Sequence, residues 1–150
     1  MSETTPAVIR YAGDEVFVAI TPSGHAQVLD TDSRRASAAS PMELLLIALG
    51  GCTAVDVISI LRKKRERVTS YEVEVRGQRR DEHPRSFSRL EVHHVLRGHD
   101  LSEKAVAQAI HLSEEKYCSV AATLRPAAEI VSRYTILPAE ADHGESTPEA

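Results

Sequence analysis

The order of apolar and polar positions predicts strands at the start of the chain. Short apolar segments are separated by the turn sequences Ala-Gly-Asp and Thr-Pro-Ser-Gly. Turn residues of this kind between short apolar segments are typical of an antiparallel meander. The expected strands cover residues 7–11, 15–20 and 25–30.

The longest apolar run, residues 44–61, predicts a long helix that begins at Ser40. Pro41 suits the first helical position, and Glu43, three residues after the serine, completes a capping box. Because apolar residues occupy nearly every side of this helix, we expect it to be buried all round. The basic segment 62–67 suits the negative end of the helix dipole, and together with polar residues inside the run it favours a core helix over a membrane span.

The second half of the chain predicts a long hairpin, two helices and a last strand. Apolar and charged residues alternate on both sides of a polar turn at residues 80–85, which predicts two paired strands with charged faces. Apolar residues then recur at helical spacing, and apolar and polar residues alternate again near the end of the chain. The expected elements are strands over 71–76 and 90–96, a helix over 101–112, a short helix from near Cys118 to about 128, and a strand over 130–136.

Length, composition and charge limit the class of protein. The 150 residues suit one domain with a single core, which we expect over residues 1–137, followed by a disordered tail over 138–150 that is rich in Pro, Glu, Ser and Ala. The net charge of −4, with both signs mixed along the chain, gives no reason to expect nucleic acid or a membrane as partner. The N-terminal residues lack the features of a secretory signal, so we expect a cytoplasmic protein.

The two cysteines are the candidate reactive groups. Cys52 follows Gly50 and Gly51 inside the long helix, where each glycine costs about 1 kcal/mol relative to alanine. This cost favours a close approach of another backbone or a small ligand beside Cys52, which makes it the candidate active site. Cys118 is expected in the first turn of a helix, where the dipole should lower its pKa. Two buried, unreactive thiols are the alternative interpretation.

Asp56 lies one helical turn after Cys52 and shares its face. Its charge opposes ionisation of the thiol, so activation of Cys52 would have to come from a cationic neighbour on another element. A structural role for Asp56, as a buried carboxylate paired with an arginine, stays open beside a functional one. The histidines lack any recognised ligand spacing with the cysteines, so no metal site is predicted.

Four motifs, in this order, resemble the OsmC/Ohr family of organic hydroperoxide resistance and osmotically induced proteins. The resemblance spans about residues 7–137, and it is strongest to the YhfA-like OsmC branch. The motifs are Ser40-Pro-Met-Glu-Leu-Leu-Leu, Gly50-Gly-Cys-Thr-Ala, Arg79-Arg-Asp-Glu-His-Pro-Arg and Glu115-Lys-Tyr-Cys-Ser-Val.

The resemblance implies an α+β, OsmC-like fold in which two chains intertwine. Antiparallel sheets would wrap around the long central cysteine-bearing helices, with two active sites at the homodimer interface. It also implies that Cys52 is the peroxidatic thiol and Cys118 the resolving thiol of an enzyme that reduces organic hydroperoxides in oxidative stress defence. The implied partners are small apolar peroxides and a lipoylated protein as dithiol reductant, with no resident cofactor. The alternative is a non-catalytic stress protein that binds an apolar ligand or senses oxidants.

The sequence departs from the family pattern at the activating ion pair. In the peroxidase branches, an arginine of the first hairpin and a glutamate just before the cysteine helix lie over the reactive thiol. Here Met42 takes the place of that glutamate, and the loop at residues 12–15 contains no arginine. Glu43 is a candidate supporting residue one position later, with its capping role as the alternative. Arg79 and Arg80 are the candidates for a replacement cation, with surface charge as the alternative.

Overall fold

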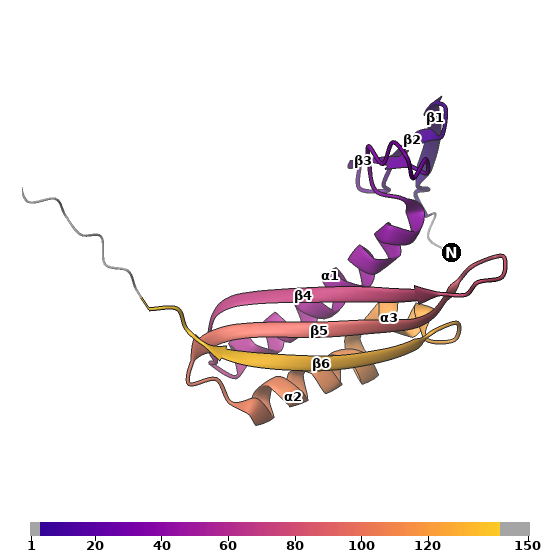
Figure 1. Cartoon of the computed structure of the whole chain (residues 1–150). Helices are drawn as coiled ribbons and strands as arrows, with labels where there is room; N and C mark the ends of the chain where they lie inside the picture. Colours follow the sequence, from indigo (N-terminus) through magenta and orange to yellow (C-terminus); the bar gives the residue numbers. More distant parts are fainter. Residues whose placement is uncertain (1–3, 142–150) are drawn as a thin grey trace, which may run out of the picture. The chain divides into compact units, whose positions relative to one another are not determined.

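The computed structural model describes residues 4–141, which divide into two compact units, one ending at Ile47 and the other beginning at Ala48. Each unit contains one three-stranded sheet, and helices complete an α+β fold, as expected (Figure 1). In the first unit the strands pair antiparallel in chain order, which confirms the predicted meander. These strands are β1 (Val8–Gly13), β2 (Val16–Ile20) and β3 (Ala26–Asp30).

The polar segment after β3 is ordered by one buried carboxylate. Asp30 is 3% exposed, and its carboxylate accepts hydrogen bonds from Arg35 Nε at 2.8 Å and from Ser37 Oγ at 2.5 Å. The bonds from Arg35 and then from Ser37 hold the pKa of Asp30 well below its ordinary value. This segment therefore has a defined path toward the following helix, although it has no regular secondary structure.

The helix α1 (Pro41–Lys63) begins with the predicted capping box. The Ser40 N–H donates to Glu43 Oε2 at 2.7 Å, and the Glu43 N–H donates to Ser40 Oγ at 3.3 Å. The first of these bonds lowers the pKa of Glu43. Glu43 therefore has the capping role that the sequence offered as one of its two interpretations.

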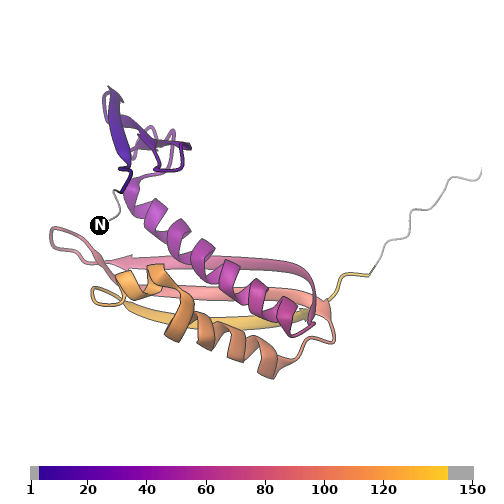
Figure 2. The same ribbon diagram turned by 180° about the vertical axis from the view of Figure 1, so that it is seen from behind.

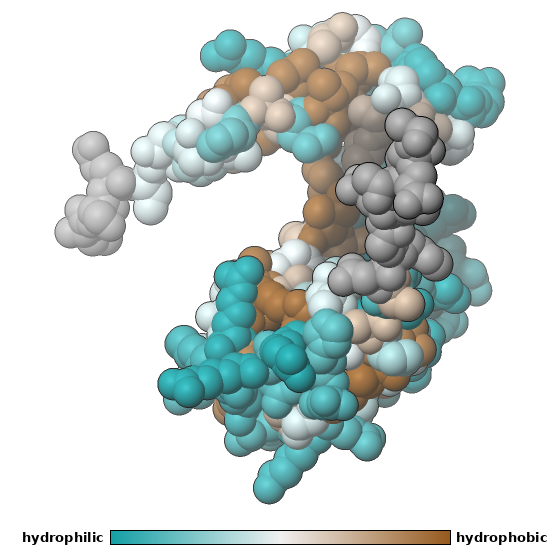
Figure 3. Space-filling model, turned by 90° about the vertical axis from the view of Figure 1, so that its left-hand side faces the viewer, coloured by the Kyte–Doolittle hydropathy of each residue, from teal (hydrophilic) through white to brown (hydrophobic). Residues whose placement is uncertain are grey.

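The prediction that α1 is buried on all sides is wrong for the single chain. One stripe of the helix is buried, whereas Leu45, Ile47 and Val55 are 36%, 63% and 67% exposed. Figure 3 shows apolar side chains left open at the surface of the chain. A single sheet covers only one face of a helix, so a helix that is apolar all round keeps an open apolar face. By length and composition alone α1 is also apolar enough to cross a membrane, as core helices of soluble proteins can be. The buried residues are Leu49, Gly50, Thr53, Val57 and Leu61.

The sheet of the second unit contains the predicted hairpin and last strand. β4 (Arg67–Arg79) and β5 (Phe87–His99) pair antiparallel, and β6 (Glu129–Pro138) pairs with β5. The β5–β6 pairing is parallel, so this sheet is mixed. The expectation of antiparallel sheets is wrong for this sheet. The physical reason is the helical segment between the two strands, since a crossover of this length returns the chain to the end at which β5 starts.

Three helical elements connect β5 to β6. They are α2 (Glu103–Leu112), the π-helical turn η1 (Ser113–Tyr117) and α3 (Ser119–Leu124). The helix expected over 101–112 is confirmed, with Ser102 Oγ accepting the Ala105 N–H at 3.1 Å as its N-cap. The short helix ends at Leu124, earlier than expected, and η1 was not predicted. Figures 1 and 2 show α2 and α3 on one face of this sheet.

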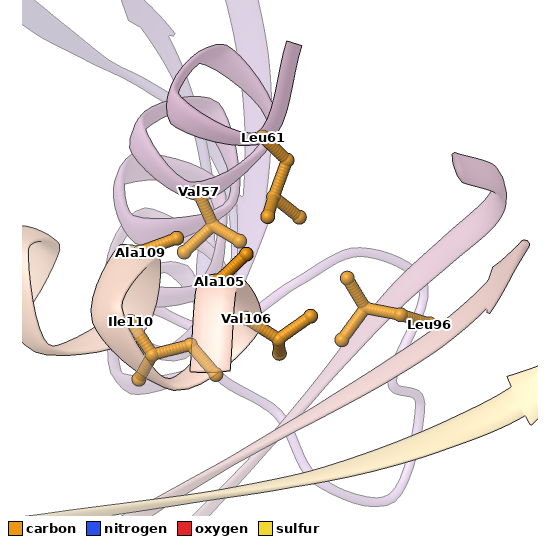
Figure 4. Close-up of a cluster of buried hydrophobic side chains, with 7 residues drawn as sticks. All are labelled: Val57, Leu61, Leu96, Ala105, Val106, Ala109 and Ile110. Carbon is orange, nitrogen blue, oxygen red and sulfur yellow. The ribbon is translucent and has the colours of Figure 1, made fainter. Parts of the chain in front are cut away.

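The core of the second unit lies where α1 and α2 meet β5 (Figure 4). Leu61 and Val57 of α1 and Leu96 of β5 are fully buried. Their partners in the cluster come from α2 and are Ala105, Val106, Ala109 and Ile110. This packing anchors the part of α1 that follows Cys52 and the helix that precedes Cys118.

The single domain expected over residues 1–137 stays a prediction. The strand β6 continues to Pro138, one residue into the expected tail. Residues 142–150 of that tail lie outside the described residues.

Candidate active site

Gly50 brings the cysteine-bearing part of α1 close to the sheet. A Cβ atom on Gly50 would lie 2.9 Å from Val75 Cγ2 of β4, closer than carbon atoms pack, so a larger residue would force the helix or Val75 to move. A Cβ atom on Gly51 would meet nothing within 4 Å. The close approach expected beside Cys52 is therefore a helix–sheet contact at Gly50, while Gly51 faces open space.

The second thiol reaches Cys52 because η1 and α3 meet at Cys118. Cys118 is the C-cap of η1 and the N-cap of α3, where its Sγ accepts the Ala121 N–H at 3.4 Å. Its Sγ, the Cys52 Sγ and a carboxylate oxygen of Asp56 all lie within 4.8 Å of one another. Cys118 is buried, being only 3% exposed, whereas Cys52 is partly exposed. Two residues 66 positions apart in the sequence thus share one site, and only Cys52 is open to a reactant.

Hydrogen-bond donors from the segment around Cys118 lower the pKa of Cys52. Burial raises the pKa of its thiol, but hydrogen bonds from the Val120 N–H, the Cys118 thiol and the Ser119 hydroxyl together lower that pKa below its ordinary value. The Ser119 Oγ lies 3.8 Å from the Cys52 Sγ. Donors at the start of α3 thus stabilise the Cys52 thiolate, whereas activation by a cationic neighbour stays a prediction.

Cys118 ionises less readily than expected. Burial above all, with smaller contributions from Cys52 and Asp56, raises the pKa of its thiol to about 11, although the Ala121 N–H acts in the opposite direction. The prediction of a lowered pKa is wrong because desolvation outweighs the start of a short helix. Cys118 stays protonated while Cys52 ionises, so the two thiols are chemically distinct.

Asp56 is held by a serine hydroxyl and not by an arginine. Ser113 Oγ donates to Asp56 Oδ2 at 2.9 Å and lies 3.0 Å from Thr53 Oγ1. Within residues 4–141 no arginine or lysine forms an ion pair with Asp56. The sequence offered no signal for Ser113, because its contact with Asp56 spans 57 residues and follows from the unpredicted turn η1.

The two candidate arginines bind backbone carbonyl groups. Arg79 Nε donates to the Arg85 carbonyl at 2.8 Å, and Arg80 Nη2 lies 3.4 Å from the Ala127 carbonyl. Neither arginine is among the groups that shift the pKa of Cys52. A role for either at the thiol stays a prediction, as does a role for Glu43 beyond its cap.

Replacing Ser119 with alanine should raise the pKa of Cys52. The variant loses one donor to the thiolate, so the rate of Cys52 alkylation should fall about threefold at a pH below that pKa. The full pH profile should shift toward higher pH, because a higher pH is then needed to form the same amount of thiolate. Alkylation kinetics measured over a pH series check this. Ser88→Ala, which removes a hydroxyl bonded to the Gln78 carbonyl, is the control and should leave the profile unchanged.

Comparison with known proteins identifies the family. Residues 33–133 match the family model described as OsmC-like protein. The chain belongs to the OsmC-like protein family. The protein named YhfA from Escherichia coli K12 is 42% identical over 133 residues, which cover 89% of this chain and 98% of YhfA. The resemblance inferred from the four sequence motifs is thereby confirmed.

Solved structures of OsmC-like and hydroperoxide resistance proteins share this fold. A hypothetical protein from Aquifex aeolicus is 32% identical with a TM-score of 0.82, and the match covers 93% of this chain and all of that one. The organic hydroperoxide resistance protein OhrB of Bacillus subtilis has a TM-score of 0.61 over 87% of this chain and 98% of its own. At 12% identity, OhrB shows the fold alone. This OsmC-like protein thus combines a family fold with two adjacent cysteines.

Proposed function

We propose that this OsmC-like protein reduces organic hydroperoxides, with Cys52 as the peroxidatic thiol and Cys118 as the resolving thiol. The observation that carries the proposal is the pairing of two distinct thiols within 4.8 Å. One is partly exposed with a lowered pKa, and the other is buried with a pKa raised to about 11. This difference assigns the first attack to Cys52, because the thiolate is the nucleophile.

The chemistry follows from that order. The Cys52 thiolate attacks the terminal oxygen of the peroxide, the O–O bond breaks, and the alkoxide takes up a proton and leaves as an alcohol. Cys52 is then a sulfenic acid, oxidised by two electrons. The Cys118 sulfur attacks the Cys52 sulfur, a disulfide forms, and the sulfenic oxygen leaves as water. An external dithiol reduces the disulfide by thiol exchange and is itself oxidised, which restores both thiols.

A groove that includes Asp56 supports apolar peroxides as substrates. It has a volume of about 400 Å³ and lies between α1, α2 and η1, with Asp56 in its wall. Its apolar wall residues are Val55, Ile60, Leu112 and Tyr117. We propose that the organic part of the peroxide binds there, and that dihydrolipoyl groups carried by a partner protein supply the electrons. The reaction needs no resident cofactor, and we assign it to the cytoplasm, with neither nucleic acid nor membrane as partner.

The same groove favours one alternative, a non-catalytic protein that binds an apolar ligand or senses oxidants through its thiols. The two functions differ in turnover. With excess dihydrolipoamide, we expect repeated consumption of cumene hydroperoxide, at least about tenfold faster than that of hydrogen peroxide, because apolar contacts contribute discrimination of this size. A single oxidation of each chain without further turnover would favour the sensor. Equal rates for both peroxides would contradict the role of the groove.

We propose further that the protein is a homodimer whose interface covers the open face of α1. Ile47 and Val55 are exposed apolar residues on this helix, 63% and 67% respectively, and burial of such surface is what stabilises subunit contacts. Sedimentation should give twice the chain mass of 16.4 kDa. Val55→Glu should shift the sedimenting species to the monomer, whereas Glu72→Gln on the strand β4 should not. A monomeric wild-type protein at micromolar concentration would contradict the proposal.

A further inference from the structure

The thiol pair shares its site with a carboxylate for which the peroxide reaction has no use. Asp56 places an oxygen within 4.8 Å of both Sγ atoms, and it lies one helical turn after Cys52. A negative charge at this position disfavours a thiolate beside it. Asp56 therefore opposes the first step of peroxide reduction and needs another explanation.

Asp56 is oriented toward the thiols and lacks a cationic partner. Its Oδ2 accepts a hydrogen bond from Ser113 Oγ at 2.9 Å, and Ser113, which is fully buried, is itself bound to Thr53 Oγ1 at 3.0 Å. In the part of the chain that the structure describes, Asp56 forms no ion pair. Two sulfurs and one oxygen thus converge without a positive charge among them. Carboxylates that bind a metal typically accept a hydrogen bond from a neighbouring group that orients them, as Ser113 does for Asp56.

We propose that the reduced protein binds one Zn²⁺ ion through Cys52 Sγ, Cys118 Sγ and a carboxylate oxygen of Asp56. Zinc takes thiolate and carboxylate ligands at about 2.3 and 2.0–2.2 Å in a tetrahedron, in which the ligand atoms lie roughly 3.5–3.8 Å apart. The observed upper limit of 4.8 Å requires each pair of ligand atoms to close by roughly 1.0–1.3 Å at most. Three protein ligands leave a fourth position for water.

The ligand set selects a thiophilic divalent ion. Two thiolates favour Zn²⁺ over Mg²⁺ or Ca²⁺, which prefer oxygen ligands throughout. Binding forms two Zn–S bonds and one Zn–O bond and releases the Cys118 proton, together with the Cys52 proton at a pH below the pKa of Cys52, with no change of oxidation state. The ion can enter at the partly exposed Cys52 and along the groove in which Asp56 lies. The cluster contains no histidine, and the sequence had predicted no metal site.

Zinc and peroxide would compete for the same sulfur. A Cys52 thiolate bound to zinc has less electron density for attack on a peroxide, and a Cys52–Cys118 disulfide has no thiolate for the metal. Bound zinc would therefore protect the reduced site, and oxidation would release the ion. This consequence rests on the proposed function, whereas metal binding itself does not.

The test is a titration of the reduced, full-length protein with Co²⁺, followed by competition with Zn²⁺ against a chromophoric chelator. Co²⁺ bound by thiolates gives sulfur-to-metal charge-transfer absorption, which counts the cysteine ligands. We expect one equivalent for each reduced chain, none for the disulfide form, and loss of charge-transfer intensity in Cys52→Ser and Cys118→Ser. Asp56→Asn should weaken Zn²⁺ binding more than about 100-fold, and Ser113→Ala about 10-fold. The control is Asp100→Asn, because the Asp100 side chain is 99% exposed and does not belong to the cluster. This variant should bind Zn²⁺ with the wild-type affinity.

Three results would overturn the site. They are no charge-transfer absorption from the reduced wild-type protein, full affinity in Asp56→Asn, and full affinity in Cys118→Ser. Circular dichroism of each metal-free variant separates a lost ligand from a lost fold. If Asp56→Asn does not fold, Cys52→Ser, at a partly exposed position, still tests the site. Because the titration contains no peroxide, binding without peroxide turnover would refute only the proposed function, and turnover without binding would refute only the zinc site.

Discussion

Cys52→Ser should abolish the reduction of organic hydroperoxides, lowering the rate at least about 1000-fold, as removal of a nucleophile does in other enzymes. A serine hydroxyl does not ionise near neutral pH and cannot be oxidised to a sulfenic acid. The hydrogen bonds that lower the pKa of Cys52, from Val120, Cys118 and Ser119, then have no thiolate to stabilise. Peroxide consumption in the presence of excess dihydrolipoamide measures the loss.

The fold should survive that substitution. Cys52 is only partly buried, and serine has nearly the same shape as cysteine, so the thermal midpoint and the sedimentation of the variant should match the wild type. Ser119→Ala provides a graded comparison, since it keeps the nucleophile and removes one donor. Peroxide turnover that persists in a folded Cys52→Ser variant would show that the reaction occurs elsewhere.

Cys118→Ser should separate the two halves of the reaction. The first oxidation of Cys52 should proceed within about threefold of the wild-type rate, because a serine hydroxyl can still donate to the Cys52 thiolate. The sulfenic acid then has no resolving thiol. Turnover with the dithiol should fall more than about tenfold, and excess peroxide should carry Cys52 on to the sulfinic and sulfonic acids. Intact mass spectra of the variant should show two or three added oxygen atoms.

The matched sample is wild-type protein treated with the same excess of peroxide. It should show the loss of two hydrogen atoms, as a disulfide requires, and few added oxygens. If the Cys118→Ser variant instead turns over normally and gains no oxygen, the dithiol resolves Cys52 directly. In that case Cys118 has another role, and the zinc site becomes its main explanation.

Local signals in the sequence predicted most of the elements. The capping box at Ser40 and Glu43, the Ser102 cap and the strand alternation around residues 80–85 each depend on neighbours within a few positions. Short-range hydrogen bonds and side-chain periodicity determine such features, so they can be read from the chain itself. The parallel pairing of β6 could not be predicted in this way, because it depends on the path of the whole helical segment before it.

The sequence selected three residues that lie together in the structure, but it did not predict their electrostatics. Cys52, Cys118 and Asp56 were selected from the sequence, and the structure brings all three together. The direction of the Cys118 pKa shift was wrong, because helix position is visible in a sequence while burial is not. Ser113 and Ser119 were missed, since both act across contacts of 57 or more residues that η1 and α3 create.

Stopped-flow oxidation of the fully reduced protein, followed by intact-mass analysis, tests the peroxidase proposal most directly. Cumene hydroperoxide and hydrogen peroxide are mixed separately with metal-free protein. We predict fast oxidation by cumene hydroperoxide, slower oxidation by hydrogen peroxide, and a product that lacks two hydrogen atoms and contains a Cys52–Cys118 disulfide. Slow reaction with both peroxides, or a product without that disulfide, would contradict the assignment of Cys52 and Cys118 as a peroxide-reducing pair.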